Sequence, residues 1–200
     1  MCRLLGIVSE TPVTAPAALG TGFASFVGMS AGKHRDGWGI VGDTVGDTGR
    51  ERRLARSIGA AHASAGFRQA ASSTAMTAGI VHLRAATGGL SVSEQNTHPF
   101  EAGEVAFAHN GQVDDIAAIE SLLDPDLRAS LTGDTDSERY FHAILSASRR
   151  VPLVEAVRRA VLGIEAVTAT PSLNAMLLTP DALVVVSSFD SRQDGDFGGD

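Results

Sequence analysis

Short apolar segments in the first half of the chain predict buried β-strands. Residues 4–8 are apolar and rich in branched side chains, so the first strand begins almost at the N-terminus. After a region rich in Gly, Ala and Ser, the segment 38–41 predicts a second strand. Two more strands are predicted at 76–86 and 104–111, and the polar segment 43–53 reads as an exposed hairpin connection.

Helical periodicity is the main signal in the second half. Segment 114–123 predicts a helix with Asp114 near its N-cap, and 136–150 predicts another with arginines at its C-terminal end, where the helix dipole favours cations. An Ala-rich helix is predicted earlier, at 60–72. The clearest helix has apolar residues at three- or four-residue spacing that define one face: Val154, Val157, Val161, Ile164 and Val167.

A strand pair closes the pattern, because residues 174–188 predict a β-hairpin with Pro180 and Asp181 in its turn. Strands first, helices in the middle and a final strand pair predict an α+β sandwich rather than regular alternation of strands and helices. Two hundred residues accommodate one domain. We place it at 1–190, followed by an acidic, Gly-rich tail at 191–200 that we expect to be mobile.

Composition excludes several classes of protein. With 44% hydrophobic and 20% charged residues, the chain is expected to be soluble and globular. Its formal net charge of -7 argues against broad binding to nucleic acid or to an anionic membrane. A single cysteine forms no internal disulfide, and the sequence has neither a signal-peptide pattern nor an apolar stretch long enough for a membrane span. We therefore expect a cytoplasmic protein.

The position of that cysteine suggests a nucleophile. Removal of Met1 would make Cys2 the first residue, with a thiol of ordinary pKa about 8.5 and an α-amine of pKa about 7.7–8.0 on the same residue. The amine could then accept the thiol proton, as in enzymes with an N-terminal nucleophile. If Met1 is retained, that base is lost. A cysteine at this position is also compatible with a small buried hydrophobic residue.

Two further motifs allow a structural and a functional interpretation. Arg84 and Thr87, at the end of a predicted strand, suit either an exposed strand end or a guanidinium clamp for a carboxylate with a hydroxyl beside it. Asn110 and Gly111 suit either a tight turn or an oxyanion hole, which needs a side-chain amide and an accessible backbone N–H.

The segment GDTDSE has the same ambiguity. Thr135 and Glu138 have the spacing of a capping box at the start of a helix. Asp136 then either favours the helix N-terminus or presents its carboxylate to a substrate ammonium group. NTHPF, with His98 before Pro99, is a loop segment that indicates little by itself.

Taken together and in order, these segments resemble the class II glutamine amidotransferase domain, which is a member of the N-terminal nucleophile hydrolases. The resemblance spans Cys2 to about Phe141 and is closest to the small stand-alone proteins of the family, some of which hydrolyse γ-glutamyl compounds. It implies a four-layer αββα sandwich and a reaction without a metal or another cofactor. The segments that carry it are Cys2, RDGWGI, LRAATGG, NTHPF, AHNGQ and TDSE.

The resemblance implies a role for each matching residue. Cys2 would attack the γ-carbonyl of glutamine and form a thioester, with its α-amine as the base. The other roles implied are an oxyanion hole of Asn110 and Gly111, a carboxylate site of Arg84 and Thr87, an ammonium site of Asp136, and a site wall shaped by Asp36 and Gly37 without a chemical step.

The sequence departs from the family pattern at two places. Ala85 and Gly88 stand where many relatives have an aromatic residue and a histidine, which either opens the pocket to a larger leaving group or weakens glutamine binding. Similar proteins also continue beyond the final hairpin with strands that complete a sheet. Either this is a shortened form, or a second copy or a partner protein covers the open edge.

Two alternatives to a glutaminase therefore stay open. One is a hydrolase of a bulkier γ-glutamyl amide, and the other is a catalytically silent domain that binds an amino acid or a protein. Metal binding is disfavoured, because the six histidines lack ligand-like spacing and one cysteine offers no thiolate cluster.

Overall fold

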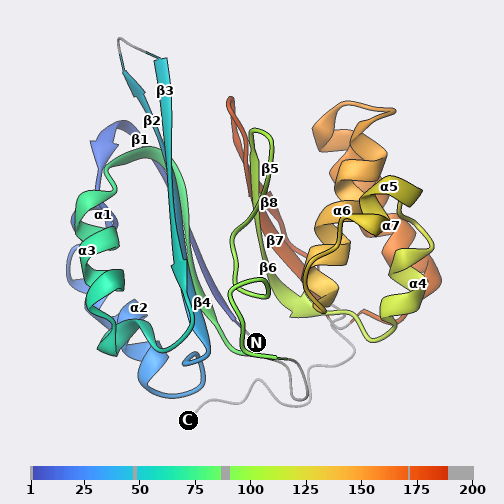
Figure 1. Ribbon diagram of the computed structural model, residues 1–200. Coiled ribbons are helices and arrows are strands. Elements are labelled where there is room, and N and C mark those ends of the chain that lie inside the picture. Colours follow the sequence, from blue (N-terminus) through green and yellow to red (C-terminus); the bar gives the residue numbers. More distant parts are fainter. Residues whose placement is uncertain (1, 47–48, 87–90, 171, 189–200) are drawn as a thin grey trace. The chain divides into compact units, whose positions relative to one another are not determined.

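The structure is a computed structural model of the chain (Figure 1), and it describes residues 2–46, 49–86, 91–170 and 172–188. Thr87, Gly88 and the tail predicted at 191–200 lie outside the described residues. Contacts divide the chain into two units: Met1–His109 with Met176–Val185, and Asn110–Ala175 with Val186–Asp200.

Four strands form the first sheet, in the order β1-β4-β2-β3, and all neighbours are antiparallel. The strands predicted at 4–8, 38–41 and 76–86 are confirmed in this sheet, and the first two extend further than expected. Arg3 pairs with Leu83 and Gly37 pairs with Arg84, so β1 and β2 both begin beside the C-terminal end of β4. The bounds are β1 (Arg3–Val13), β2 (Gly37–Gly46), β3 (Gly49–Ser57) and β4 (Met76–Arg84).

The segment 43–53 connects two antiparallel strands as a hairpin, as predicted, but it is strand over more of its length and less exposed at Asp43 than expected. Its described residues continue β2 and β3, and Asp43 is only 3% exposed. The Asp43 carboxylate accepts two hydrogen bonds from Arg52, from Nε and Nη2, each 2.7 Å long. Because a bidentate arginine pair satisfies the carboxylate, polar residues are compatible with a strand here.

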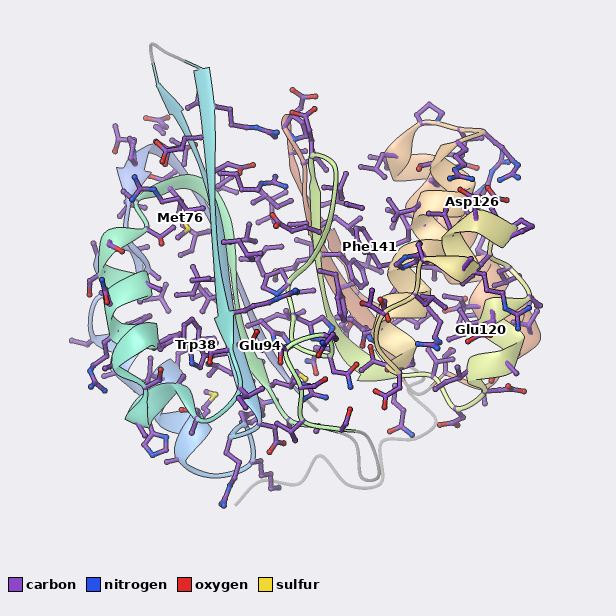
Figure 2. The ribbon with its side chains drawn as sticks, viewed as in Figure 1. Trp38, Met76, Glu94, Glu120, Asp126 and Phe141 are labelled. Atoms are coloured by element: carbon purple, nitrogen blue, oxygen red, sulfur yellow. The ribbon has the colours of Figure 1, made fainter. Side chains whose placement is uncertain are left out.

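Helices cover one face of this sheet (Figure 1). The helix predicted at 60–72 is confirmed as α3 (Ala65–Ser73), which follows the 3-10 turn η2 (Ala61–Ala63). Trp38 and Met76 lie on the helix-covered face (Figure 2), and Trp38 packs edge to face against Phe67 of α3.

The Gly/Ala/Ser-rich region, for which no element was predicted, also contributes to this cover. Its helices are short, so they show little of the periodicity by which a longer amphipathic helix is found. They are α1 (Ala15–Leu19), α2 (Thr21–Gly28) and η1 (Met29–Ala31).

The opposite face of the first sheet packs on strands of a second sheet. Val41 and Ile80 form a buried cluster with Ala106, Ala108 and Leu178. The second sheet has the order β5-β6-β7-β8, and the predicted hairpin is confirmed by the hydrogen bond from Thr179 N to Ala182 O. Its strands are β5 (Phe100–Ala102), β6 (Val105–Gln112), β7 (Ser172–Leu178) and β8 (Leu183–Val186).

The second unit is mainly helical, with α6 packed against α4, α5 and α7. The predicted helices are confirmed, and α5, which has only five residues, was not predicted. The first of them is capped by Asp115 rather than by Asp114. The helices are α4 (Ile116–Glu120), α5 (Pro125–Ala129), α6 (Asp136–Ser148) and α7 (Leu153–Val167).

The apolar face of α7 is only partly as predicted. Val157 and Ile164 are buried, whereas Val154 is 66% exposed and Val167 is 42% exposed. Both exposed valines lie in the terminal turns of the helix. Two of the alanines of α7, Ala156 and Ala160, complete the buried face instead.

The predicted α+β class is confirmed by these sheets and helices. Within the first unit, α1–α3, the first sheet and strands of the second sheet stack in that order. In the part of the chain that the structure describes, no helix combines the length and apolar character needed to cross a membrane.

Candidate active site

Cys2 lies directly before β1 and beside the end of β4. Its Sγ accepts a hydrogen bond from Ala85 N at 3.4 Å and lies 3.6 Å from Ala85 O, to which it donates. The residue is 9% exposed. The antiparallel pairing of β1 with β4 thus brings the thiol to the residue that follows Arg84, although the two are more than 80 positions apart in the sequence.

Arg84 is buried, which overturns the interpretation as an exposed strand end. It is 3% exposed, and its Nη2 donates to Ser91 O at 3.2 Å. Arginine is rarely buried to this degree unless its charge and donors are satisfied. Its expected companion, Thr87, is outside the described residues.

Asp36 holds the same end of β4 from the other side. Its backbone N–H donates to Arg84 O at 3.1 Å, and its Oδ2 accepts from Ala86 N at 2.8 Å. Gly37 follows as the first residue of β2. The predicted wall residue Asp36 therefore contacts the main chain of the segment that carries Arg84.

The motifs RDGWGI and NTHPF contact each other, which the sequence did not indicate. A Cβ atom at Gly39 would lie 2.0 Å from His98 O, so only glycine permits this approach. Arg56 on β3 donates to Thr97 O at 3.2 Å and to Pro99 O at 2.9 Å. Arg56 was not predicted as a site residue, because one of several arginines in a polar segment gives no signal of a contact 41 residues away.

Loop residues next to Arg84 are held by side-chain hydrogen bonds. Asn96 Nδ2 donates to Ser91 O at 3.1 Å and to Ser91 Oγ at 2.9 Å. Ser91 O thus accepts from both Asn96 and Arg84. NTHPF is therefore part of the support of Arg84 rather than an isolated loop.

Two buried histidines, His82 of β4 and His98 of this loop, pack against each other. Their ring centroids are 4.4 Å apart, and neither ring is more than 3% exposed. Burial lowers the pKa of His82 to about 3. Burial, followed by the neighbouring His82, also lowers the pKa of His98 well below its ordinary value. Both rings are therefore neutral near pH 7.

In the second unit, Asn110 and Gly111 lie within β6 and do not form a tight turn. Neither has a positive φ, which an Asn-Gly hairpin turn of the common type would need. Asn110 O accepts from Ser172 Oγ at 3.3 Å. Its side-chain Oδ1 is buried and has no hydrogen-bond partner among the described residues.

Asp136 is the first residue of α6 and is 9% exposed. Its Oδ2 accepts from Val113 N at 2.8 Å, and its Oδ1 accepts from Ser137 N at 2.8 Å and Ser137 Oγ at 3.3 Å. The carboxylate thus links the residues after β6 to the start of α6. Two carboxylate oxygens offer about four acceptor positions, so these three donors leave about one for a further donor.

The predicted capping box forms only in part. Thr135 is the N-cap of α6, and its Oγ1 accepts from Glu138 N at 3.2 Å. The Glu138 carboxylate instead accepts from Thr132 N and Gly133 N, each at 2.8 Å. Glu138 therefore fixes the loop that leads into α6, directly before Asp136 at the start of the helix.

Among the described residues, no group of three or more His, Cys, Asp or Glu side chains could hold a metal ion.

Of the predicted site residues, the structure brings Cys2, Asp36 and Arg84 together in the first unit. In the second unit it links Asp136 to the segment that follows Asn110 and Gly111.

Comparison with known proteins gives a family match over most of the chain. The model of the family described as glutamine amidotransferases class-II matches residues 1–188. A glutamine-fructose-6-phosphate aminotransferase (isomerizing) of Gluconobacter oxydans is 43% identical over 68 residues, which are 34% of this chain and 11% of that protein. Its counterpart in Acinetobacter baylyi is 34% identical over 113 residues, 56% of this chain and 17% of that protein. The chain thus spans less than a fifth of either relative.

Solved structures show the same fold. A glutamine aminotransferase class-II domain protein from Silicibacter pomeroyi has a TM-score of 0.59 and 23% identity, covering 78% of this chain and 70% of that one. The glutamine phosphoribosylpyrophosphate amidotransferase of B. subtilis has a TM-score of 0.60 and 16% identity, covering 94% of this chain and 37% of that one.

Proposed function

This chain belongs to the class II glutamine amidotransferase family, and on that premise we propose that it hydrolyses the γ-amide of glutamine through a thioester on Cys2. The observation that carries the proposal is the contact of the Cys2 thiol with the main chain of Ala85, next to the buried Arg84. It supports a reactive sulfur beside a group that can bind a carboxylate.

The proposed reaction has two steps at Cys2. After removal of Met1, the α-amine takes the thiol proton, and Sγ forms a bond to the γ-carbonyl carbon while the C–N bond breaks. The proton goes to the departing nitrogen, which leaves as ammonia. Water then attacks the thioester carbon, the C–S bond breaks, and glutamate and the Cys2 thiol are released.

Asn110 and Gly111 are the proposed oxyanion hole. Each tetrahedral intermediate carries a negative oxygen, which needs preorganised donors. The side-chain amide of Asn110, whose buried Oδ1 has no partner among the described residues, supports this role. A half-turn of the amide exchanges its oxygen and nitrogen, so that Nδ2 becomes the donor at that place.

The amino-acid end of glutamine needs groups of opposite charge. We assign its α-carboxylate to Arg84 and Thr87, because a guanidinium group binds a carboxylate in bidentate geometry. We assign its α-ammonium group to Asp136, whose carboxylate is held rigidly by Val113 and Ser137.

A bulkier γ-glutamyl amide is the second candidate substrate. Ala85, whose main chain contacts the thiol, is half-buried and has only a methyl side chain. The small side chain favours room for a larger leaving group beside the sulfur. Turnover of glutamine and of γ-glutamyl-cysteine derivatives, compared at equal enzyme concentration, distinguishes the two substrates.

The test is intact-mass analysis before and after reaction with 6-diazo-5-oxonorleucine, together with assays of glutamate and ammonia. We expect a chain without Met1 that takes up one label and turns over glutamine. Cys2→Ala should lose both the label and the turnover. Turnover that persists in Cys2→Ala refutes the mechanism, and a wild-type chain that takes up no label indicates a binding domain.

A further inference from the structure

We infer that Asp36 is a positioning residue for substrate binding: it fixes the segment Arg84–Ala86, from which Arg84 holds the α-carboxylate. The inference rests on the proposed function. Asp36 touches none of the reacting atoms in this account, and it acts through the main chain of the segment that carries Arg84.

The segment 84–86 is held from two sides. On one side, Cys2 Sγ contacts both the N–H and the carbonyl of Ala85. On the other side, Asp36 contacts the residues that flank Ala85: its N–H donates to Arg84 O, and its Oδ2 accepts from Ala86 N at 2.8 Å. Three consecutive residues are thus tied to the start of β1 and to the start of β2.

The backbone that carries Asp36, at the start of β2, is itself closely packed. Gly37, the next residue, pairs with Arg84 across the sheet. A Cβ atom at Gly37 would lie 3.2 Å from the Thr97 side chain and 3.3 Å from Ser57 O. The start of β2 therefore has little room to move towards the loop. Because this backbone is held in place, the Asp36 carboxylate restrains the Ala86 N–H that it binds.

The Asp36 contact is not a local turn. The carboxylate and its donor, Ala86 N, are 50 residues apart in the sequence. The hydrogen bond therefore joins the start of β2 to the end of β4 rather than neighbouring residues. The acceptor is a carboxylate, and hydrogen bonds to charged groups are stronger than those between neutral groups. Removing it leaves the Ala86 N–H without that acceptor, immediately before Thr87.

These contacts predict an effect on binding more than on chemistry. Arg84 lies at one end of the held segment and is the proposed carboxylate group, so its displacement weakens glutamine binding. The thiol contacts Ala85, which remains tied to β1 through Cys2 itself. We therefore expect Asp36→Ala to raise KM for glutamine about tenfold, the equivalent of one hydrogen bond to a charged group, and to change kcat less than threefold.

The experiment compares three variants by steady-state glutaminase kinetics and by hydrogen exchange of the Ala86 N–H. Asp36→Ala should raise KM and speed this exchange. Asp36→Asn keeps a side-chain oxygen that can accept from Ala86 N, so it should restore most of the wild-type KM. The matched control is Asp115→Ala in the second unit. It removes a carboxylate that likewise accepts a hydrogen bond from a backbone N–H, with 3.0 Å between Ala118 N and Asp115 Oδ1. It should leave KM unchanged.

The outcomes separate this inference from the proposed function. If the wild-type chain turns over glutamine and Asp36→Ala leaves KM unchanged, the positioning role is wrong and the proposed function stands. An equal loss of kcat in Asp36→Ala and Asp36→Asn also overturns it, because the carboxylate would then act in the reaction itself. A wild-type chain without turnover overturns both, whatever the exchange rate of Ala86.

Discussion

Acid should destabilise this protein through its buried histidine pair. His82 is fully buried, and burial lowers its pKa to about 3, whereas an unfolded chain gives histidine a pKa of about 6.5. Between these two values the unfolded chain binds a proton at this position and the folded chain does not. The free energy of unfolding therefore falls as the pH decreases from about 6.5 towards 3.

The size of the effect follows from the two pKa values. Within that window, one such histidine changes the free energy of unfolding by about 1.4 kcal/mol per pH unit. One unit below the unfolded pKa, at pH 5.5, His82 alone therefore costs roughly 1.4 kcal/mol relative to pH 7.5 or above. His98 acts in the same direction, because its pKa is also lowered by burial. The slope from either ring fades above about pH 7.5, where the unfolded chain no longer binds the proton.

Urea unfolding at pH 7.5, 6.5, 5.5 and 5.0 measures this dependence for the wild type and His82→Gln. The variant loses packing at every pH, so the informative quantity is the slope rather than the absolute stability. We expect the slope below pH 6.5 to be smaller in His82→Gln by about one proton. The matched control is His62→Gln at an exposed position, which separates burial from the loss of a histidine as such. Equal slopes in His82→Gln and the wild type would refute the reasoning.

Two further substitutions test the site and its support. Asn110→Ala should lower kcat for glutamine about 10²–10³-fold, as the loss of one oxyanion donor does, and a change confined to KM would exclude that role. Gly39→Ala should destabilise the protein by at least about 2 kcal/mol in urea unfolding, because its methyl group would meet His98 O, which belongs to the backbone. Gly46→Ala on the same strand, where a Cβ atom meets nothing within 4 Å, should change stability little, and equal losses would contradict the packing argument.

The predictable part of the fold is the part with a regular pattern. Residues 4–8 and most of 76–86 are apolar, and both segments form strands of the first sheet. The polar strand β3 could not be recognised, because its stability depends on contacts such as that of Arg52 with Asp43 on β2. Short helices such as α1 give too few residues for a periodic signal.

The candidate site divides in the same way. Cys2 and Arg84 could be proposed from the sequence, because a thiol at position 2 and a guanidinium group at a strand end suggest their chemistry by residue type alone. The residues that hold the loop next to Arg84 were not predicted, because they act through contacts between distant segments. Gly39 allows the close approach of His98 O, and Arg56 donates to Thr97 O. Neither residue type carries a signal of its own, and only the register of β2 between β3 and β4 explains both.

The same contacts explain why the departure at Ala85 is compatible with the proposed function. Cys2 Sγ contacts the N–H and the carbonyl of residue 85, and Asp36 contacts the main chain on both sides of it. These bonds are independent of the side chain at position 85, so an alanine there keeps the thiol, the segment and Arg84 in the same arrangement. The side chain at position 85 therefore bears on the proposed choice between glutamine and a bulkier amide rather than on the main-chain contacts of the thiol.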